Sequence, residues 1–175
     1  RAAAIALTGL LLLAPAPGHG EAPQQADRIA VEVRDVDGKA RALPDPAKPI
    51  LLVYEDRKSE RQNEHVFPIL TKVRRPENAG KIELVAVADV EAYDFWPAKQ
   101  FVIAHVRRAI KKDGSPIYLD WRGAVRRELG LAPGRSAFVL LAPDGTVRWT
   151  GQGALTAPQQ AQLIAELQRA GVSLD

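Results

Sequence analysis

Two short, continuous apolar runs, residues 50–54 (ILLVY) and 84–88 (LVAVA), constrain the fold of this chain most strongly. Runs of this length and composition are typical of strands that are buried on both faces of a sheet. Between them, apolar residues from Val66 to Val73 recur at steps of three and four, which indicates a helix. The order strand, helix, strand predicts two parallel strands in an α/β sheet.

The helix between these runs contains a proline. We expect the helix to begin near Glu60 and to be kinked at Pro68, because an interior proline removes a backbone hydrogen bond.

The second half of the chain continues the alternation. The patterns predict a helix over residues 97–112 that stops at Gly114, a short strand at 117–120 and a helix at 124–129. Strands at 137–141 and 147–150 flank a turn and form an antiparallel hairpin, and Thr156 with Gln159 forms a capping box before the last helix. An extended segment at 29–33, followed by a turn signal, opens the domain. These elements predict an α/β fold with a mixed central sheet, parallel βαβ plus a C-terminal antiparallel hairpin, and helices on both faces.

The first residues have the pattern of an export signal. Arg1 precedes an apolar run at 2–14, which small residues follow, and a run of about a dozen residues is too short to cross a bilayer. We therefore expect a signal peptide at 1–22, a single domain at 23–175 and a periplasmic or secreted protein. An uncleaved leader or anchor is the alternative.

The stretch at 118–155, YLDWRGAVRRELGLAPGRSAFVLLAPDGTVRWTGQGAL, resembles the thioredoxin-like superfamily. The resemblance rests on a short helix, a glycine, a strand, an Asp-Gly turn and a glycine before the last helix, in which the matching positions are Asp120, Gly130, Asp144, Gly145 and Gly151 or Gly153. It is greatest to exported thiol-disulfide reductases and peroxiredoxin-related domains, and the layout is similar to that of the exported YtfJ-like group.

The resemblance implies where a redox site would lie, and this chain departs from it there. The two cysteines of a CxxC motif are replaced by Glu60 and Asn63, and the cis-proline position is occupied by Ala137. We expect a trans bond between Ser136 and Ala137, since a cis bond before a residue other than proline costs about 2.5–4 kcal/mol. The chain has no cysteine, which excludes thiol-disulfide exchange and cysteine peroxidase chemistry.

The resemblance and the missing thiols together favour a redox-inactive protein-binding or peptide-binding module, or an assembly module. The implied binding positions are those of the altered redox site: Glu60, Asn63, Arg135, Ser136 and Ala137. We expect no catalytic residue and no cofactor. The alternative is a thiol-independent enzyme, or a protein that binds a small ligand or a metal.

Glu60, Glu64 and His65 could form a metal site or could be ordinary solvated side chains. The spacing lacks the two histidines of a zinc-binding HExxH helix, which favours the second interpretation and no metal.

The distribution of charge argues against a nucleic-acid partner but does not decide the role of the basic groups on the surface. The net charge of +3 is spread along the chain, which argues against nucleic acid, and no segment after the signal has transmembrane length. The expected protein or peptide partner follows from the resemblance and not from the charge. Two groups of basic residues are either solvated helix faces or patches for an anionic partner: Arg107, Arg108, Lys111 and Lys112, and Arg122, Arg126 and Arg127. Tyr93, Phe95 and Trp96 form either a lid on the sheet or a partner-binding loop.

Overall fold

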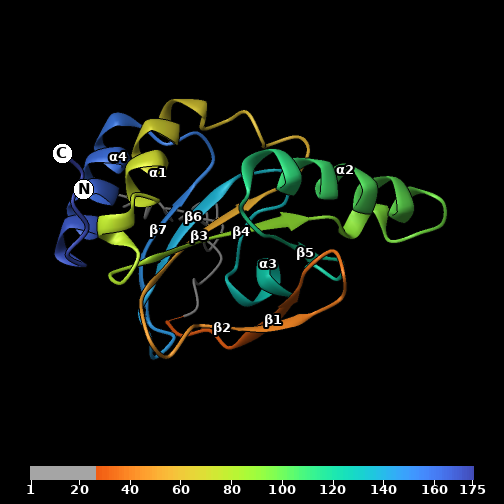
Figure 1. The fold of residues 1–175 in the computed structure, drawn as a ribbon, viewed down its shortest axis with the longest axis horizontal. Helices are drawn as coiled ribbons and strands as arrows, with labels where there is room; N and C mark the ends of the chain where they lie inside the picture. The colour runs from red at the N-terminus through yellow and green to blue at the C-terminus, as the bar shows by residue number, and fades with distance from the viewer. Residues whose placement is uncertain (1–26) are drawn as a thin grey trace, which may run out of the picture.

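The computed structural model describes residues 27–175, so the expected signal segment lies outside the described residues. One sheet organises the fold (Figure 1). Its strands are β1 (Val31–Arg34), β2 (Ala40–Leu43), β3 (Ile50–Glu55), β4 (Glu83–Asp89), β5 (Ile117–Asp120), β6 (Ala137–Leu141) and β7 (Val147–Gln152). The helices are α1 (Phe67–Val73), α2 (Ala98–Asp113), α3 (Ala124–Glu128) and α4 (Ala157–Arg169), with short 3-10 turns η1 (Glu64–Val66), η2 (Pro76–Asn78) and η3 (Glu91–Tyr93).

The sheet is mixed, as the order of elements predicts. Its strand order is β2-β1-β5-β4-β3-β6-β7, in which β3, β4 and β5 are parallel and the remaining neighbours are antiparallel. The two apolar runs of the sequence are β3 and β4 at the centre, and Leu51 and Leu52 are fully buried. The hairpin of β6 and β7 flanks β3 on one side, while the hairpin of β1 and β2 extends the sheet beyond β5 on the other.

Helices cover both faces of the sheet (Figure 1). On one face α1 and α4 pack on the sheet through buried residues such as Leu70, Leu163 and Leu167, and α2 packs through Val106 farther along the same side of Figure 1. On the other face α3 joins the β1–β2 hairpin in a cluster that includes Val125. The expected α/β architecture is therefore confirmed.

The predicted kink at Pro68 is wrong. The helix begins later than expected, at Phe67, so Pro68 lies in the first turn of α1, where its missing N–H has no intrahelical partner to lose. The chain from Asp56 to Asn63 instead forms consecutive turns.

Two predicted helix ends and one predicted peptide-bond geometry are confirmed. Gly114 ends α2 in the left-handed conformation with φ of 71°, and Thr156 and Gln159 form the capping box of α4. Among the described peptide bonds, Leu43–Pro44 and Trp96–Pro97 are cis, so the bond between Ser136 and Ala137 is trans, as expected.

Candidate functional site

Asn63, at the second cysteine position of the resemblance, is a buried structural residue. Its amide donates hydrogen bonds to Ser136 Oγ at 2.5 Å and to the Gly153 carbonyl at 2.8 Å. Its side-chain oxygen, Oδ1, accepts a bond from the Leu155 N–H at 2.8 Å. The side-chain amide thus joins the loop after β3 to the loop that precedes β6 and to the loop that follows β7.

Gln62 and Ser136 extend this contact. The Gln62 side chain accepts a bond from the Ser136 N–H at 3.2 Å and donates one to the Gly134 carbonyl at 3.2 Å. Ser136 and Ala137 are fully buried. A polar lock, which we define as Gln62, Asn63 and Ser136, therefore occupies the place of the redox centre that the resemblance implies.

The five predicted binding positions divide by burial. The structure brings Asn63, Ser136 and Ala137 together beneath the surface, where their side chains are not accessible to a partner in this conformation. Glu60 and Arg135 are exposed. A role of these two residues in binding stays a prediction.

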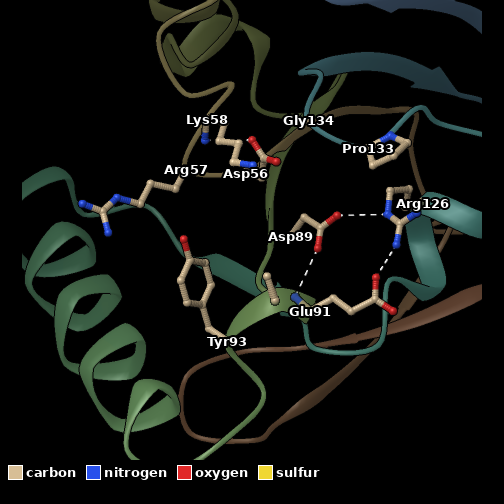
Figure 2. A pocket seen from close by; sticks show the side chains of 10 residues that line it. Asp56, Arg57, Lys58, Asp89, Glu91, Tyr93, Arg126, Pro133 and Gly134 are labelled. Carbon is tan, nitrogen blue, oxygen red and sulfur yellow. Dashed lines mark hydrogen bonds and ion pairs between the residues drawn. The ribbon is translucent and has the colours of Figure 1, made fainter.

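A surface hollow beside the polar lock was not predicted from the sequence. We call it the β3–β4 cleft, because it opens at the carboxyl ends of these two parallel strands, the usual side for ligands in α/β sheets. It is lined by Asp56, Arg57, Lys58, Asp89, Glu91, Ala92, Tyr93, Arg126, Pro133 and Gly134 (Figure 2). The lining comes from four separate segments, none of which carries a recognisable local motif.

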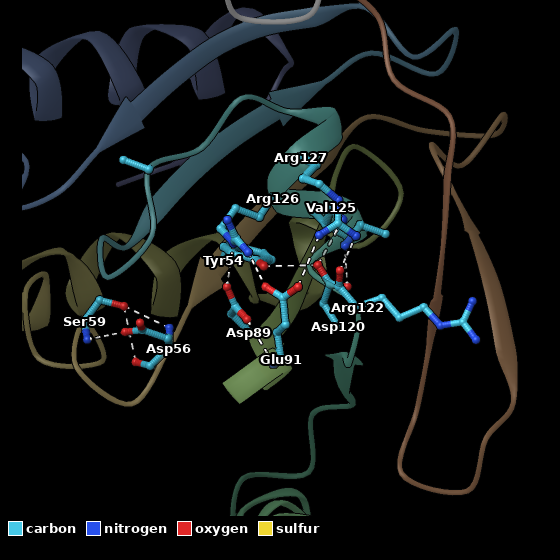
Figure 3. Close-up of polar contacts among 12 residues, drawn as sticks. Tyr54, Asp56, Ser59, Asp89, Glu91, Asp120, Arg122, Val125, Arg126 and Arg127 are labelled. Atoms are coloured by element: carbon cyan, nitrogen blue, oxygen red, sulfur yellow. Dashed lines mark hydrogen bonds and ion pairs between the residues drawn. The ribbon is translucent and has the colours of Figure 1, made fainter. Parts of the chain in front are cut away.

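One wall of the β3–β4 cleft is held by ion pairs. Arg126 of α3 donates from Nε to Asp89 Oδ2 at 3.1 Å and from its terminal nitrogen to Glu91, which also pairs with Arg127 at 3.2 Å (Figure 3). Gly123 permits this approach: a Cβ there would lie 2.7 Å from Glu91 Oε2 and 2.8 Å from the Arg126 guanidinium. Arg126 and Arg127 are therefore not the unpaired basic patch that the sequence left open.

A buried acid supports this wall from below. Asp120 accepts bonds from the backbone N–H groups of Ala124 and Val125 at 2.8 and 2.9 Å, which fixes the start of α3. The Tyr54 hydroxyl donates to Asp120 Oδ2 at 3.1 Å (Figure 3). Burial, together with the nearby Asp120 and Asp89 charges, raises the pKa of Tyr54 far above its ordinary value, so the phenol stays protonated and remains a donor.

The opposite side of the β3–β4 cleft offers free cations. Arg57 and Lys58 are exposed, and no ion pair links either side chain to another described residue. In Figure 2, Arg57 and Tyr93 lie across the cleft from Arg126 and Pro133. The cleft thus combines a wall that is neutralised by ion pairs with a solvated wall that carries Arg57, Lys58 and the carboxylate of Asp56.

Glu55 ends β3 next to the loop that forms this solvated wall. Burial raises the pKa of its carboxyl to about 7, and the nearby acids Glu60 and Asp56 add to the rise. Its Oε1 is buried without a hydrogen-bond partner among the described residues. Ionisation of the half-buried Glu55 carboxyl is therefore expected to lower the free energy of unfolding.

The described residues bear on two further questions, a metal site and a helix that spans a membrane. Glu60, Glu64 and His65 do not converge, and within residues 27–175 no three potential ligands are grouped to hold an ion. The His65 ring is instead 3.1 Å from the Leu155 carbonyl. No helix in this described range is long and apolar enough to cross a membrane.

Comparison with known proteins gives the fold but no close relative. No protein-family model and no curated protein matches the chain. Solved structures do match: the exposed lipoprotein thioredoxin Etrx1 of Streptococcus pneumoniae shares 16% identity with a TM-score of 0.57, over 79% of this chain and 100% of that one. A thiol-disulfide oxidoreductase of Bacteroides fragilis shares 14% with a TM-score of 0.53, over 81% and 99%. StoA of Bacillus subtilis shares 19% with a TM-score of 0.51, over 78% and 97%.

The chain therefore has a thioredoxin-like fold, as the resemblance in the sequence implied. It lacks the CxxC motif of thiol-disulfide oxidoreductases, because it contains no cysteine. Thiolate chemistry is excluded, since neither the glutamate nor the amide at the two positions supplies a sulfur nucleophile.

Proposed function

We propose that this protein is a redox-inactive, thioredoxin-like binding module that holds an acidic segment of a partner protein in the β3–β4 cleft. The observation that carries the proposal is the pair of unpaired cations, Arg57 and Lys58, on the wall of a cleft whose other wall is already neutralised. Carboxylates of a partner would supply the missing counter-charges through charge-assisted hydrogen bonds.

The polar lock supports a binding role over catalysis. It replaces a reactive centre by a satisfied amide and hydroxyl network, which holds the loops on either side of the cleft in place. A preorganised site loses less conformational entropy when it binds. The exposed Glu60 and Arg135 lie on the same two loops and are assigned to the rim of the site.

The proposal includes export. The signal-like pattern at 1–22 supports a domain that begins near residue 23 and works outside the cytoplasm, and the likeness to an exposed lipoprotein thioredoxin agrees with it. N-terminal sequencing of the protein recovered from the cell envelope tests this: a new N-terminus between residues 15 and 23 is expected, and an intact leader contradicts it.

A panel of labelled ten-residue peptides tests the cleft. Acidic, neutral and basic peptides are titrated with the protein, and binding is followed by fluorescence anisotropy. Acidic peptides are expected to bind, and the R57A/K58A variant to lose about tenfold or more in affinity, because two charge-assisted contacts are removed.

The matched control is R74A/K81A, which removes the same charge from exposed positions at the end of α1 and before β4. Equal loss of affinity in both variants would show a nonspecific charge effect and contradict the proposed site. Failure of every peptide class to bind would contradict the proposed function itself.

A further inference from the structure

The end of the molecule formed by the β4–α2 connection exposes large aromatic side chains. Trp96 is 82% exposed, Phe101 71% and Phe95 58%. Within the described chain only Phe67, on α1, is a further exposed large hydrophobic residue. The sequence left open whether this loop is a lid over the sheet. Tyr93 packs against the cluster under α2, whereas Phe95 and Trp96 face solvent, so the lid interpretation does not apply to these two residues. Exposed aromatic clusters of this kind mark interaction surfaces.

Phe95 and Trp96 precede α2, and Phe101 lies near the start of this helix, which carries basic residues farther along. Along α2, Phe101, Arg108 and Lys112 are separated by seven and then four residues, so they lie on one side of the helix. Lys111 lies beside them. The opposite side of α2, which includes Val102, Val106 and Ile110, packs against the sheet. The outer face of α2 therefore has Phe101 near one end and basic residues at the other, about 16 Å apart along the axis.

The basic residues of α2 divide into two that form ion pairs and three for which no described side chain is a partner. Arg107 pairs with Asp37 at 2.7 Å, and Lys99 pairs with Asp94 at 2.6 Å. Among the described side chains, none forms an ion pair with Arg108, Lys111 or Lys112. The helix, Ala98–Asp113, has five lysines and arginines, and its one acidic residue is Asp113 at its end.

The geometry points to the outer face of α2 as a docking surface for an anionic phospholipid bilayer. Tryptophan and phenylalanine partition into the interface between headgroups and acyl chains, while lysine and arginine on the same helix contact headgroup phosphates. A lipid surface matches the aromatic and the basic residues of this face, since its apolar acyl chains lie beneath a layer of negatively charged headgroups.

The placement of the helix allows this contact. The β4–α2 connection lies at the right-hand end of the long axis in Figure 1, and α2 runs back from it along the upper edge of the molecule. The described chain ends at the opposite end, beside α4. The helix therefore lies at the periphery of the described chain.

Vesicle co-sedimentation tests the inference. Vesicles of phosphatidylglycerol and phosphatidylcholine are compared with pure phosphatidylcholine, at low and at high salt. We expect binding to the anionic vesicles, weaker binding in high salt, and none to the neutral vesicles. Brominated lipids are expected to quench Trp96 fluorescence, and W96S is expected to remove that quenching.

Neutral variants separate this face from general positive charge. R108Q/K111Q/K112Q is expected to bind anionic vesicles about a hundredfold more weakly, because each basic residue near such a surface contributes roughly a factor of five. R74Q/K81Q/R148Q removes three exposed charges from other elements and is expected to bind with little change. Circular dichroism of each variant confirms that it is folded.

Two results would overturn the inference. One is the absence of binding to anionic vesicles at low salt, including the case in which a partner protein or a second copy of the chain occupies this face instead. The other is equal weakening by the two triple variants. Both results are independent of the peptide titrations that test the β3–β4 cleft, because the cleft residues are unchanged in every variant used here.

Discussion

Asn63, at the position that the resemblance assigns to the second cysteine, is a structural residue in this fold. Its side-chain amide satisfies three polar groups from two loops while it is itself fully buried. A buried polar group that loses its partner incurs the full cost of its desolvation, so the side chain cannot be shortened without consequence.

Replacement of Asn63 by alanine is expected to lower the free energy of unfolding by about 2–4 kcal/mol, because the Leu155 N–H and the Gly153 carbonyl are left without this partner. Urea denaturation followed by circular dichroism measures the change. Glu60→Ala, three residues earlier and exposed, serves as the control and is expected to change stability by less than about 0.5 kcal/mol. A neutral effect of N63A would contradict the structural role of the polar lock.

Glu55 gives a prediction in pH. The pKa of its carboxyl is about 7 in the folded chain against an ordinary value of 4.5, so between these values the unfolded chain releases the proton first. The folded state then binds more protons, and this group makes the free energy of unfolding fall as the pH rises from about 4.5 to about 7. The contribution is constant outside that window.

The variant Glu55→Gln removes this titration. Relative to the wild type, it is expected to gain stability progressively from about pH 4.5 to about pH 7, by up to about 3 kcal/mol. Denaturation curves at half-unit pH steps measure the difference. Parallel curves for the two proteins across this range would show that Glu55 has an ordinary pKa.

At the scale of elements, α3 depends on a residue outside itself. Only five residues long, it starts after Gly123, which has no side chain to cap it. Asp120 supplies the acceptors from the end of β5. Because Arg126 projects from this helix, the anchoring of α3 also positions one wall of the β3–β4 cleft.

Replacement of Asp120 by alanine is therefore expected to loosen α3 as well as to destabilise the fold by about 2–4 kcal/mol. Hydrogen exchange is expected to be faster at the amides of Val125 and its neighbours than in α4, beyond the global change. Tyr54→Phe removes only the hydroxyl donor and is expected to cost about 1 kcal/mol without this local effect. Uniform acceleration in α3 and α4 would contradict the anchoring role.

At the scale of the whole molecule, the β1–β2 hairpin completes the core. Ile29, Val33 and Leu43 are buried in the cluster that α3 and the central strands share. Arg41 of β2 forms a two-pronged contact with Glu83 of β4 at 2.7 and 2.8 Å, and this contact lowers the pKa of the Glu83 carboxyl. The hairpin also pairs with β5, which would otherwise be an exposed edge strand.

A chain that starts at residue 49 is expected to lose cooperative unfolding and to bind the hydrophobic dye ANS, because the apolar surface under the hairpin is uncovered. A chain that starts at residue 27 keeps every described element and is the control. Calorimetry and ANS fluorescence distinguish the two. Cooperative unfolding of the shorter chain would show that the hairpin is an accessory to the fold.

Local patterns in the sequence determined the elements of this protein. Apolar runs long enough to be buried on both faces predicted β3 and β4, and Gly114 and the Thr156 capping box predicted the ends of helices, because each of these signals acts over a few residues. The missing cysteines alone excluded thiol chemistry. The start of α1 was misjudged, since proline fits a first turn as well as it interrupts an interior one.

The tertiary structure decided what occupies the altered site. Asn63 and Ser136 are 73 positions apart, and Asp89 and Arg126 are 37 apart, so no local pattern relates them. The fold brings these residues together, buries one pair as a lock and places the other on the wall of a cleft. The same long-range packing decided that Trp96 faces solvent, because burial depends on which elements meet a loop and not on its own sequence.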